Sequence, residues 1–226
     1  ELYATDIAKK NDRLTIGNLD LKPEKNNYFS LSAEYVHERF SVSVNAFYNN
    51  IRDMIDYNTI ATGDKAMEQY GHKEVRQRDN IAEAKVHGIN VSANAYLGAG
   101  FNLSGGYTHL NTQDVELEQP IDKSIKNAYN INAQWAHSWK IYRLNINLNG
   151  RFNSKRFSKS YGYAPEYQLW DLNTRHSFNL KSVIIEPGFG MENLFDYMDD
   201  RPYNSNYATL TPGRSFYISL SLKFKS

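Results

Sequence analysis

The chain of 226 residues contains no cysteine, which excludes disulfide scaffolds, cysteine-based zinc sites, thiol nucleophiles and iron–sulfur ligation. An excess of charge of one sign is also missing, because 26 Lys and Arg stand against 25 Asp and Glu. This balance argues against nucleic acid as a partner, since nucleic-acid-binding domains carry a clustered basic excess. No stretch approaches the ~18 consecutive apolar residues of a transmembrane helix. A membrane β-barrel is still allowed, because only every second residue of such a strand meets lipid.

Aromatic residues and asparagine are both abundant for so hydrophilic a chain. Tyr 17, Phe 11 and Trp 3 together make 14% of the residues. Much of the asparagine lies in strand-like runs, as at Asn145, Asn147 and Asn149, although asparagine is depleted from ordinary strands. A water-filled interior would make such a polar strand face acceptable.

Alternation of apolar and polar residues with a period of two is the dominant pattern. Between Tyr142 and Asn153 the even-numbered positions are mostly apolar, while the odd-numbered positions carry Arg and Asn. No stretch of comparable length shows helical periodicity. The alternation predicts nine strands, many of them as long as the ~9–11 residues that cross a bilayer at a tilt. Their approximate ranges are 27–37, 39–57, 80–97, 101–112, 127–138, 142–157, 166–179, 182–196 and 213–224.

Short turns and long polar connections alternate along the chain. The long connections span about 58–79, 113–126, 158–165 and 197–212. Short turns at one end and long loops at the other are typical of an outer-membrane barrel. Trp135, Trp139 and Tyr142 surround one short turn, which fits the aromatic girdle of such a barrel. A soluble β-sandwich also alternates, but the strand length and the loop asymmetry favour the membrane barrel.

The odd number of predicted strands implies missing partners, because single-chain bacterial barrels have an even number. The last strand should end in the periplasm, so the first of the nine also runs downward, and residues 1–26 would precede it as an extracellular segment. Both sheet edges would then be unpaired in lipid, at several kcal/mol per unsatisfied group. We therefore expect residues 1–226 to be the C-terminal part of one larger barrel.

Three motifs resemble segments of TonB-dependent outer-membrane receptors. They are GNLDLKPEK at 17–25 with Tyr28 and Leu31, Asn80 with AKVHGI at 84–89, and NLFD at 193–196 with Tyr203, PGR at 212–214 and a last strand through Phe224. Together they span essentially the whole chain in the family's order. Leu19 stands where the family often has proline, and two residues follow the aromatic Phe224 on which the family's insertion signal usually ends.

The resemblance implies an all-β fold, a transmembrane antiparallel barrel of 22 strands of which this chain would supply strands 14–22. It implies a plug domain and a TonB box outside these residues, and a location in the outer membrane of a Gram-negative bacterium. The implied partners are the remainder of the barrel, the TonB–ExbB–ExbD complex, outer-membrane lipids and a surface lipoprotein. The implied activity is active uptake of haem, cobalamin or a ferric siderophore as transported ligand, with no covalently bound cofactor.

Ligand contacts are expected in the long loops, where aromatic and cationic groups suit flat or anionic chelates. The expected contact residues are Tyr70, His72, Arg76, Tyr161, Tyr163 and Tyr203. His72 would be an axial ligand if the cargo is haem, although a solvated loop histidine is the simpler interpretation. We expect no resident metal, because Asp196, Asp199 and Asp200 match no EF-hand spacing. His87 is placed on the side of the lumen by this interpretation.

Two other functions are left open by the sequence. A passive porin or structural surface barrel would share the strand pattern, and outer-membrane barrels also include enzymes. No G-x-S-x-G elbow, no H-E-x-x-H and no phosphate-binding glycine loop occurs. The sequence therefore predicts no catalytic residues, and transport is the favoured function.

Overall fold

The computed structural model describes residues 8–10, 12–159, 161–199 and 212–225. The chain divides into two compact units. The loop unit comprises residues 1–29, 48–87 and 112–121, and the sheet unit comprises residues 30–47, 88–111 and 122–226.

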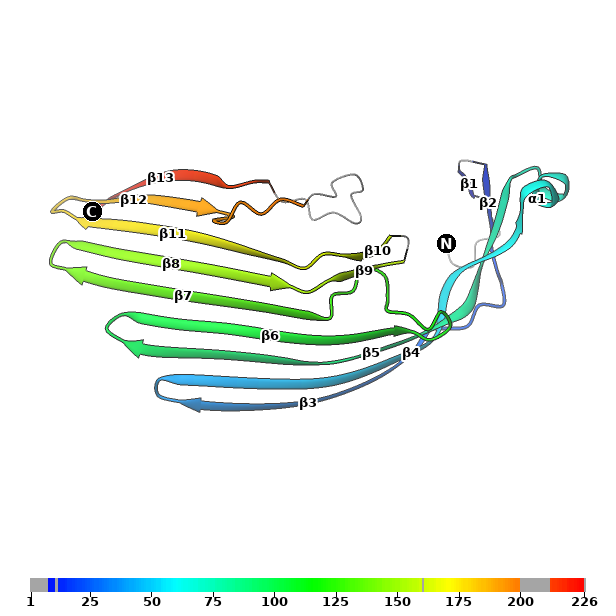
Figure 1. Cartoon of the computed structure of the whole chain (residues 1–226), viewed down its shortest axis with the longest axis horizontal. Helices are drawn as coiled ribbons and strands as arrows, with labels where there is room; N and C mark the ends of the chain where they lie inside the picture. Colours follow the sequence, from blue (N-terminus) through cyan, green and yellow to red (C-terminus); the bar gives the residue numbers. More distant parts are fainter. Residues whose placement is uncertain (1–7, 11, 160, 200–211, 226) are drawn as a thin grey trace. The chain divides into compact units, whose positions relative to one another are not determined.

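Nine long strands carry the fold, in the places where the alternation predicts them (Figure 1). They are β3 (Lys25–His37), β4 (Phe40–Thr62), β5 (Glu74–Gly98), β6 (Phe101–Asp114), β7 (Asn127–Trp139), β8 (Tyr142–Asn153), β11 (Tyr167–Asn179), β12 (Val183–Glu192) and β13 (Ser215–Phe224). Four short strands accompany them: β1 (Ala8–Lys10), β2 (Arg13–Ile16), β9 (Arg156–Ser158) and β10 (Gly162–Ala164). The all-β prediction is confirmed.

The longest connection, predicted as a loop over 58–79, is mostly regular structure. β4 continues to Thr62, β5 begins at Glu74, and the helix α1 (Gly63–Tyr70) joins them. The helix ends at Gly71, whose left-handed φ of 70° lets its N–H donate to the Met67 carbonyl at 2.9 Å, as in a common helix C-cap. The sequence did not reveal this segment because eight residues are too few to establish a helical period.

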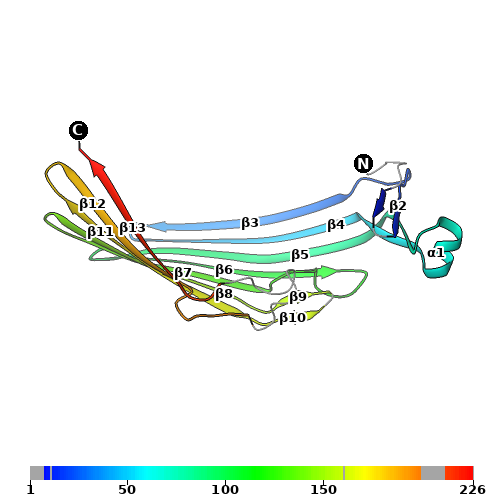
Figure 2. The same cartoon turned by 90° about the horizontal axis from the view of Figure 1, so that it is seen from above.

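The strands pair in chain order. β3 pairs with β4 and β4 with β5, and the order then runs β5-β6-β7-β8-β11-β12-β13. Antiparallel ladders join β7 to β8, from Trp139↔Tyr142 to Ala128↔Asn153, and continue through β11 and β12 to β13. In Figures 1 and 2 the strands of the sheet unit follow one another in a single layer.

This register gives the sheet unit one apolar face and one polar face, because side chains alternate along each strand. One row of cross-strand partners on the apolar face is Phe101, Trp135, Ile146, Thr174, Phe189 and Ile218. The adjacent row on the polar face is Asn102, Gln134, Asn147, Asn173, Gly190 and Tyr217.

The apolar face does not fold over a core of its own. The buried hydrophobic residues of the described chain are Leu14, Leu21, Ala66, Val75, Ala84, Ala164 and Leu169. On β13, by contrast, Ile218 is 84% exposed and Phe224 is 82% exposed. A soluble sandwich would bury these side chains between two sheets, so the single-layer arrangement favours a barrel wall. No helix in the described ranges is long and apolar enough to cross a membrane.

Candidate functional site

Aromatic rings cluster on the apolar face at the end with the short turns. Trp139 stacks on Tyr142 with ring centroids 5.4 Å apart, and Tyr142 lies 5.0 Å from Phe178. His137 meets the edge of Trp139 at 4.4 Å, and the Tyr142 hydroxyl is hydrogen-bonded to His176 Nδ1 at 2.8 Å. Rings with an apolar body and a polar atom favour the headgroup region of a bilayer. This is the aromatic girdle that the sequence predicts.

A second aromatic row crosses the same face toward the long connections. Tyr107 stacks on Tyr129 with centroids 4.6 Å apart, and Tyr129 lies 5.6 Å from Phe152. His87, which the sequence interpretation places in the lumen, stacks on Tyr48 at 6.2 Å. Tyr48 has the apolar phase of β4, so the placement of His87 was wrong. Its position number has the same parity as Ile89, and side chains of equal parity share a strand face.

The polar face carries a connected set of amides. Asn132 Nδ2 donates to the Oδ1 atoms of Asn147 at 3.2 Å and Asn149 at 2.5 Å. Farther along this face, Lys223 Nζ lies 2.6 Å from a Glu186 carboxylate oxygen. Asparagine is acceptable in these strands because neighbouring amides satisfy one another and the face does not have to enter an apolar core.

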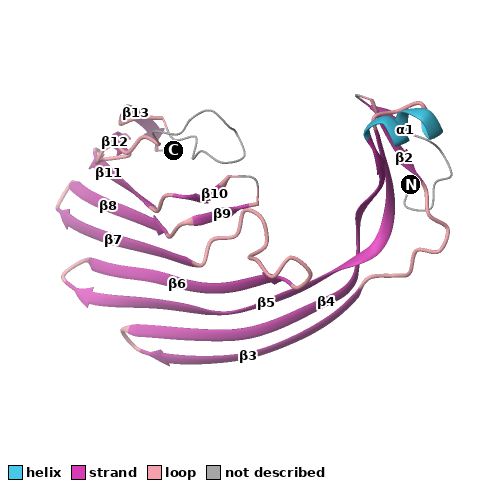
Figure 3. Cartoon of the chain, turned by 45° about the vertical axis from the view of Figure 1, so that its right-hand side comes forward, coloured by secondary structure: helices cyan, strands magenta, loops and turns pink. Residues whose placement is uncertain are grey.

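The tip of the loop unit, formed by residues 12–16 and 61–78, has its own small core. Ala66 of α1 and Val75 of β5 are fully buried against Leu14 of β2, and Tyr70 packs against this cluster. Figure 3 shows α1 between the ends of β4 and β5, with β2 alongside. β2 pairs with β5 in parallel, from Arg13↔Glu74 to Ile16↔Gln77, so the segment that precedes β3 fastens the tip.

A carboxylate between two guanidinium groups closes the same tip. Arg13 Nε lies 2.7 Å from one oxygen of Glu74, and Arg76 Nε lies 2.5 Å from the other. These hydrogen bonds, first that from Arg13 and then that from Arg76, lower the pKa of Glu74 below its ordinary value. The expected ligand residue Arg76 is therefore already paired with a carboxylate of its own strand.

The predicted ligand residues fall in both units. Tyr70, His72 and Arg76 belong to the tip, where His72 is half-buried in the bend between α1 and β5. Tyr161 and Tyr163 lie on the hairpin of β9 and β10 in the sheet unit, where they are 51% and 55% exposed.

Gly162, with a left-handed φ of 78°, begins β10, and the rings of Tyr163 and Phe157 meet edge to face with centroids 5.3 Å apart. Tyr203 lies outside the described residues.

One aromatic–cation pair was not predicted from the sequence. The Arg78 guanidinium carbon lies 5.3 Å from the centroid of the Tyr57 ring, and Arg78 Nη2 donates to the Tyr57 hydroxyl at 3.2 Å. Both residues were visible as an aromatic and a cation near the longest connection. Their contact could not be predicted because it depends on the pairing of two strands joined through α1. Among the described residues, no group of three or more His, Asp and Glu could hold a metal ion.

The first family motif is fixed by asparagine side chains. Asn80 Oδ1 accepts the N–H of Lys22 at 2.7 Å, and Asn80 Nδ2 donates to the carbonyls of Lys22 at 2.9 Å and Asp53 at 2.6 Å. Asn18 Nδ2 donates to the Arg78 carbonyl at 2.9 Å. The GNLDLKPEK segment is therefore held against β5 through the side chains of Asn18 and Asn80, which both belong to the motifs that resemble the family.

The other two motifs also have structural roles. A Cβ at Gly88 would lie 2.2 Å from the His109 carbonyl oxygen, so only glycine allows this approach of β6. Asn193 accepts the Tyr197 N–H at 2.8 Å and donates to the carbonyls of Tyr197 at 2.7 Å and Pro212 at 3.1 Å. These contacts join the residues that directly follow β12 to Pro212, shortly before β13.

Long antiparallel strands in one layer, with a polar face opposite an apolar face that carries an aromatic girdle, define a part of a membrane β-barrel. Residues 1–194 match the family described as TonB dependent receptor-like, beta-barrel, and the chain belongs to this family.

A curated relative and two solved structures agree with this assignment. The chain is 28% identical over 162 residues to the probable TonB-dependent siderophore receptor PiuA of Acinetobacter baumannii, a match that covers 64% of this chain and 21% of PiuA. The chain thus spans about a fifth of that relative. The crystal structure of BauA, the ferric preacinetobactin receptor of the same species, aligns with a TM-score of 0.68 at 17% identity, over 89% of this chain and 30% of BauA. The siderophore receptor PirA of A. baumannii gives 0.67 at 18% identity, over 94% and 33%.

The two structural likenesses confirm the fold. The prediction of a receptor barrel and not an enzyme agrees with the family and with the curated relative.

Proposed function

We propose that the protein takes up a ferric siderophore across the outer membrane of a Gram-negative bacterium, in a TonB-dependent manner. The observation that carries this proposal is the family match over residues 1–194, together with a curated relative named as a TonB-dependent siderophore receptor. The sequence interpretation also allowed haem and cobalamin. None of the three proteins compared above is described as a receptor for either of them. A ferric siderophore is therefore the favoured cargo.

The two faces of the sheet unit suit opposite surroundings. The apolar face with its two aromatic rows meets outer-membrane lipid, and the polar amide face lines the water-filled interior. β3 and β13 each pair with one neighbour within the described residues, so further strands of the same barrel must cover both edges. The plug domain then occupies the lumen, and the TonB–ExbB–ExbD complex supplies the energy for transport.

Exposed aromatic groups of each unit are the proposed ligand contacts. Tyr161 and Tyr163 offer rings and hydroxyls to an anionic chelate, and the Arg78–Tyr57 pair offers a cation beside a ring. His72 and Tyr203 remain in the proposed set. Tyr70 and Arg76 contribute chiefly by holding the tip, because one packs on its core and the other pairs with Glu74.

The test is binding and uptake by the full-length receptor. Purified receptor is titrated with a ferric catecholate siderophore, a ferric hydroxamate siderophore, haem and cobalamin, and binding is followed by intrinsic fluorescence. We expect saturable binding of a ferric siderophore and uptake of its radioactive iron in iron-starved cells.

Uptake should disappear in cells that lack TonB. Tight binding of haem or cobalamin alone would replace the proposed cargo, and uptake that persists without TonB, with steady conductance in planar bilayers, would indicate a passive porin.

A further inference from the structure

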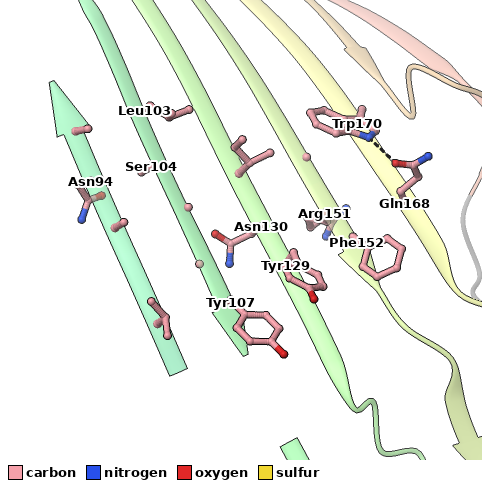
Figure 4. A pocket seen from close by; sticks show the side chains of 17 residues that line it. Asn94, Leu103, Ser104, Tyr107, Tyr129, Asn130, Arg151, Phe152, Gln168 and Trp170 are labelled. Atoms are coloured by element: carbon pink, nitrogen blue, oxygen red, sulfur yellow. Dashed lines mark hydrogen bonds between the residues drawn. The ribbon is translucent and has the colours of Figure 1, made fainter. Parts of the chain in front are cut away.

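The apolar face carries a groove of about 570 Å³ that the aromatic girdles do not explain. Figure 4 shows Tyr107, Tyr129 and Phe152 in a row along one side of it, with Leu103 and Trp170 on the other side. Its volume lies within the ~300–1,000 Å³ usual for small-molecule sites. The groove is therefore large enough to hold part of a ligand and is not a gap between two rings.

Two glycines shape the groove, one by leaving open space and the other by admitting a tryptophan ring. Gly105, Ile131, Gly150 and Trp170 are successive cross-strand partners on β6, β7, β8 and β11, so two of four adjacent positions add no side chain to this face. The Trp170 ring extends over Gly150, where a Cβ would lie 2.7 Å from the ring. The floor is thus low at Gly105, while the Trp170 ring fills the space above Gly150 and bounds the groove.

A small polar cluster lies just beyond the aromatic row, on the same face. The Tyr107 hydroxyl donates to Asn127 Oδ1 at 3.0 Å, and His109 Nδ1 is hydrogen-bonded to the same oxygen at 2.8 Å. The groove itself is apolar, so one end of the site suits a hydrocarbon and the other suits hydroxyl or amide groups. An amphipathic molecule fits this arrangement better than a fully polar or a fully apolar one.

We propose that this groove binds an acyl chain of an outer-leaflet glycolipid, with the glycolipid head at the Tyr107–His109–Asn127 cluster. The proposal rests on the proposed function, which turns this face toward lipid. The groove is continuous with that lipid-facing surface, and at β7 and β8 it lies within a few residues of the ends that lead into the long connections. Those ends face the outer leaflet in such a barrel. A concave apolar site on a lipid-facing wall selects a chain from the surrounding lipid.

The test uses the full-length receptor with side chains added on one face or the other of β6. Gly105→Val places a branched side chain in the groove, and Ala93→Leu narrows it from β5 without touching a glycine. Gly106→Val is the matched control, because the Gly106 backbone lines the groove but its Cβ would lie on the polar face, 2.8 Å from the Asn130 side chain. Folding is checked by the heat-dependent mobility of the barrel on gels, and binding of a ferric siderophore is measured on the same preparations.

Each receptor is stripped of lipid, incubated with rough lipopolysaccharide or with phosphatidylethanolamine, and examined by native mass spectrometry in a mild detergent. We expect retained lipopolysaccharide on the wild type and on Gly106→Val, and its loss on Ala93→Leu and on any Gly105→Val receptor that folds.

Retention that is unchanged in Ala93→Leu, retention of phosphatidylethanolamine in place of lipopolysaccharide, or a receptor dimer held by this face would each overturn the proposal. Siderophore binding should be equal in all variants. A receptor that shows the lipid pattern but binds no siderophore would leave the groove assignment standing and overturn the uptake function alone.

Discussion

Single asparagine side chains hold the connections of this protein together. Asn80 joins the segment before β3 to β4 and β5 through three hydrogen bonds, and Asn193 organises the segment after β12. An amide side chain suits this task because it offers donors and an acceptor at once. Such positions resemble binding residues in a sequence, although their partners here are backbone groups.

Replacement of Asn80 by alanine should destabilise the loop unit, because two carbonyls and one N–H lose their partner. A loss of about 1–3 kcal/mol is expected for such a group. The measurement is thermal unfolding of the full-length receptor in detergent, combined with limited proteolysis at residues 17–25. The exposed Asn26→Ala variant is the matched control, and equal stability of the two variants would show that the Asn80 contacts contribute nothing.

The contacts of Glu74 with Arg13 and Arg76 should make the stability of the tip depend on pH in acid but not near neutrality. Because Arg13 and Arg76 lower the pKa of Glu74, the charged carboxylate stabilises the folded tip above the pKa of the unfolded chain. That stabilisation is lost only as the pH falls through the folded value, which lies below the usual ~4.3 of glutamate. Hydrogen exchange of residues 63–73 should therefore be constant between pH 8 and pH 5 apart from intrinsic chemistry, and should rise at lower pH.

The variant Glu74→Gln is the control for this acid transition, since its amide does not titrate. Its tip should exchange faster than the wild type at neutral pH and show no further change in acid. An acid transition of equal size in this variant would assign the effect to another group.

Strand pairing in the sheet unit depends on close approaches that only glycine allows. Gly88 lies against the His109 carbonyl oxygen, which a side chain on β5 would displace. Gly105 is less crowded, because a Cβ there would lie 3.2 Å from the nearest backbone oxygen. The two glycines thus differ in what they do, one permitting the contact of β5 with β6 and the other leaving a groove.

The substitution Gly88→Ala should impair assembly of the barrel, whereas Gly105→Ala should be tolerated. The added methyl at residue 88 would overlap a backbone atom that the sheet holds in place, and such overpacking costs about 1–3 kcal/mol or more. The yield of heat-modifiable receptor in outer-membrane fractions measures the effect. Normal yield of the Gly88→Ala receptor would mean that β6 can shift to accept the side chain.

The molecule combines a single-layer sheet of the barrel family with a tip that folds around its own core. The tip core of Leu14, Ala66 and Val75 is small but fully enclosed. The sheet unit is held together by the hydrogen-bonded ladders between its strands, and its exposed apolar side chains need an apolar environment. The tip should therefore be removable without loss of the sheet.

Excision of residues 64–72 and replacement by Asn-Gly, with Gly63 and Lys73 kept, should leave a folded receptor that binds its ligand weakly. The ends are already paired, since the Gly63 N–H donates to the Lys73 carbonyl at 2.9 Å, and Asn-Gly favours a two-residue hairpin turn. We expect the affinity for the ferric siderophore to fall about tenfold or more, equivalent to about 1.4 kcal/mol. Replacement of residues 115–118, which lie between the paired Asp114 and Gln119, by the same turn is the matched control and should leave the affinity unchanged. Unchanged affinity after excision of the tip would remove His72 from the proposed site.

The sequence by itself determined the nine strands, their two faces and the aromatic girdle, because alternation along a strand is a local property that fixes which side chains share a face. It also indicated the family, through motifs such as Asn80 and Asn193. Only the tertiary structure decided the helical tip, the pairing of Arg13 and Arg76 with Glu74, and the groove between Gly105 and Gly150. The helix is too short to show a period of its own in the sequence. The contact of Arg13 with Glu74 and the groove depend on the register between strands far apart in the chain, and that register is set by pairing across the sheet.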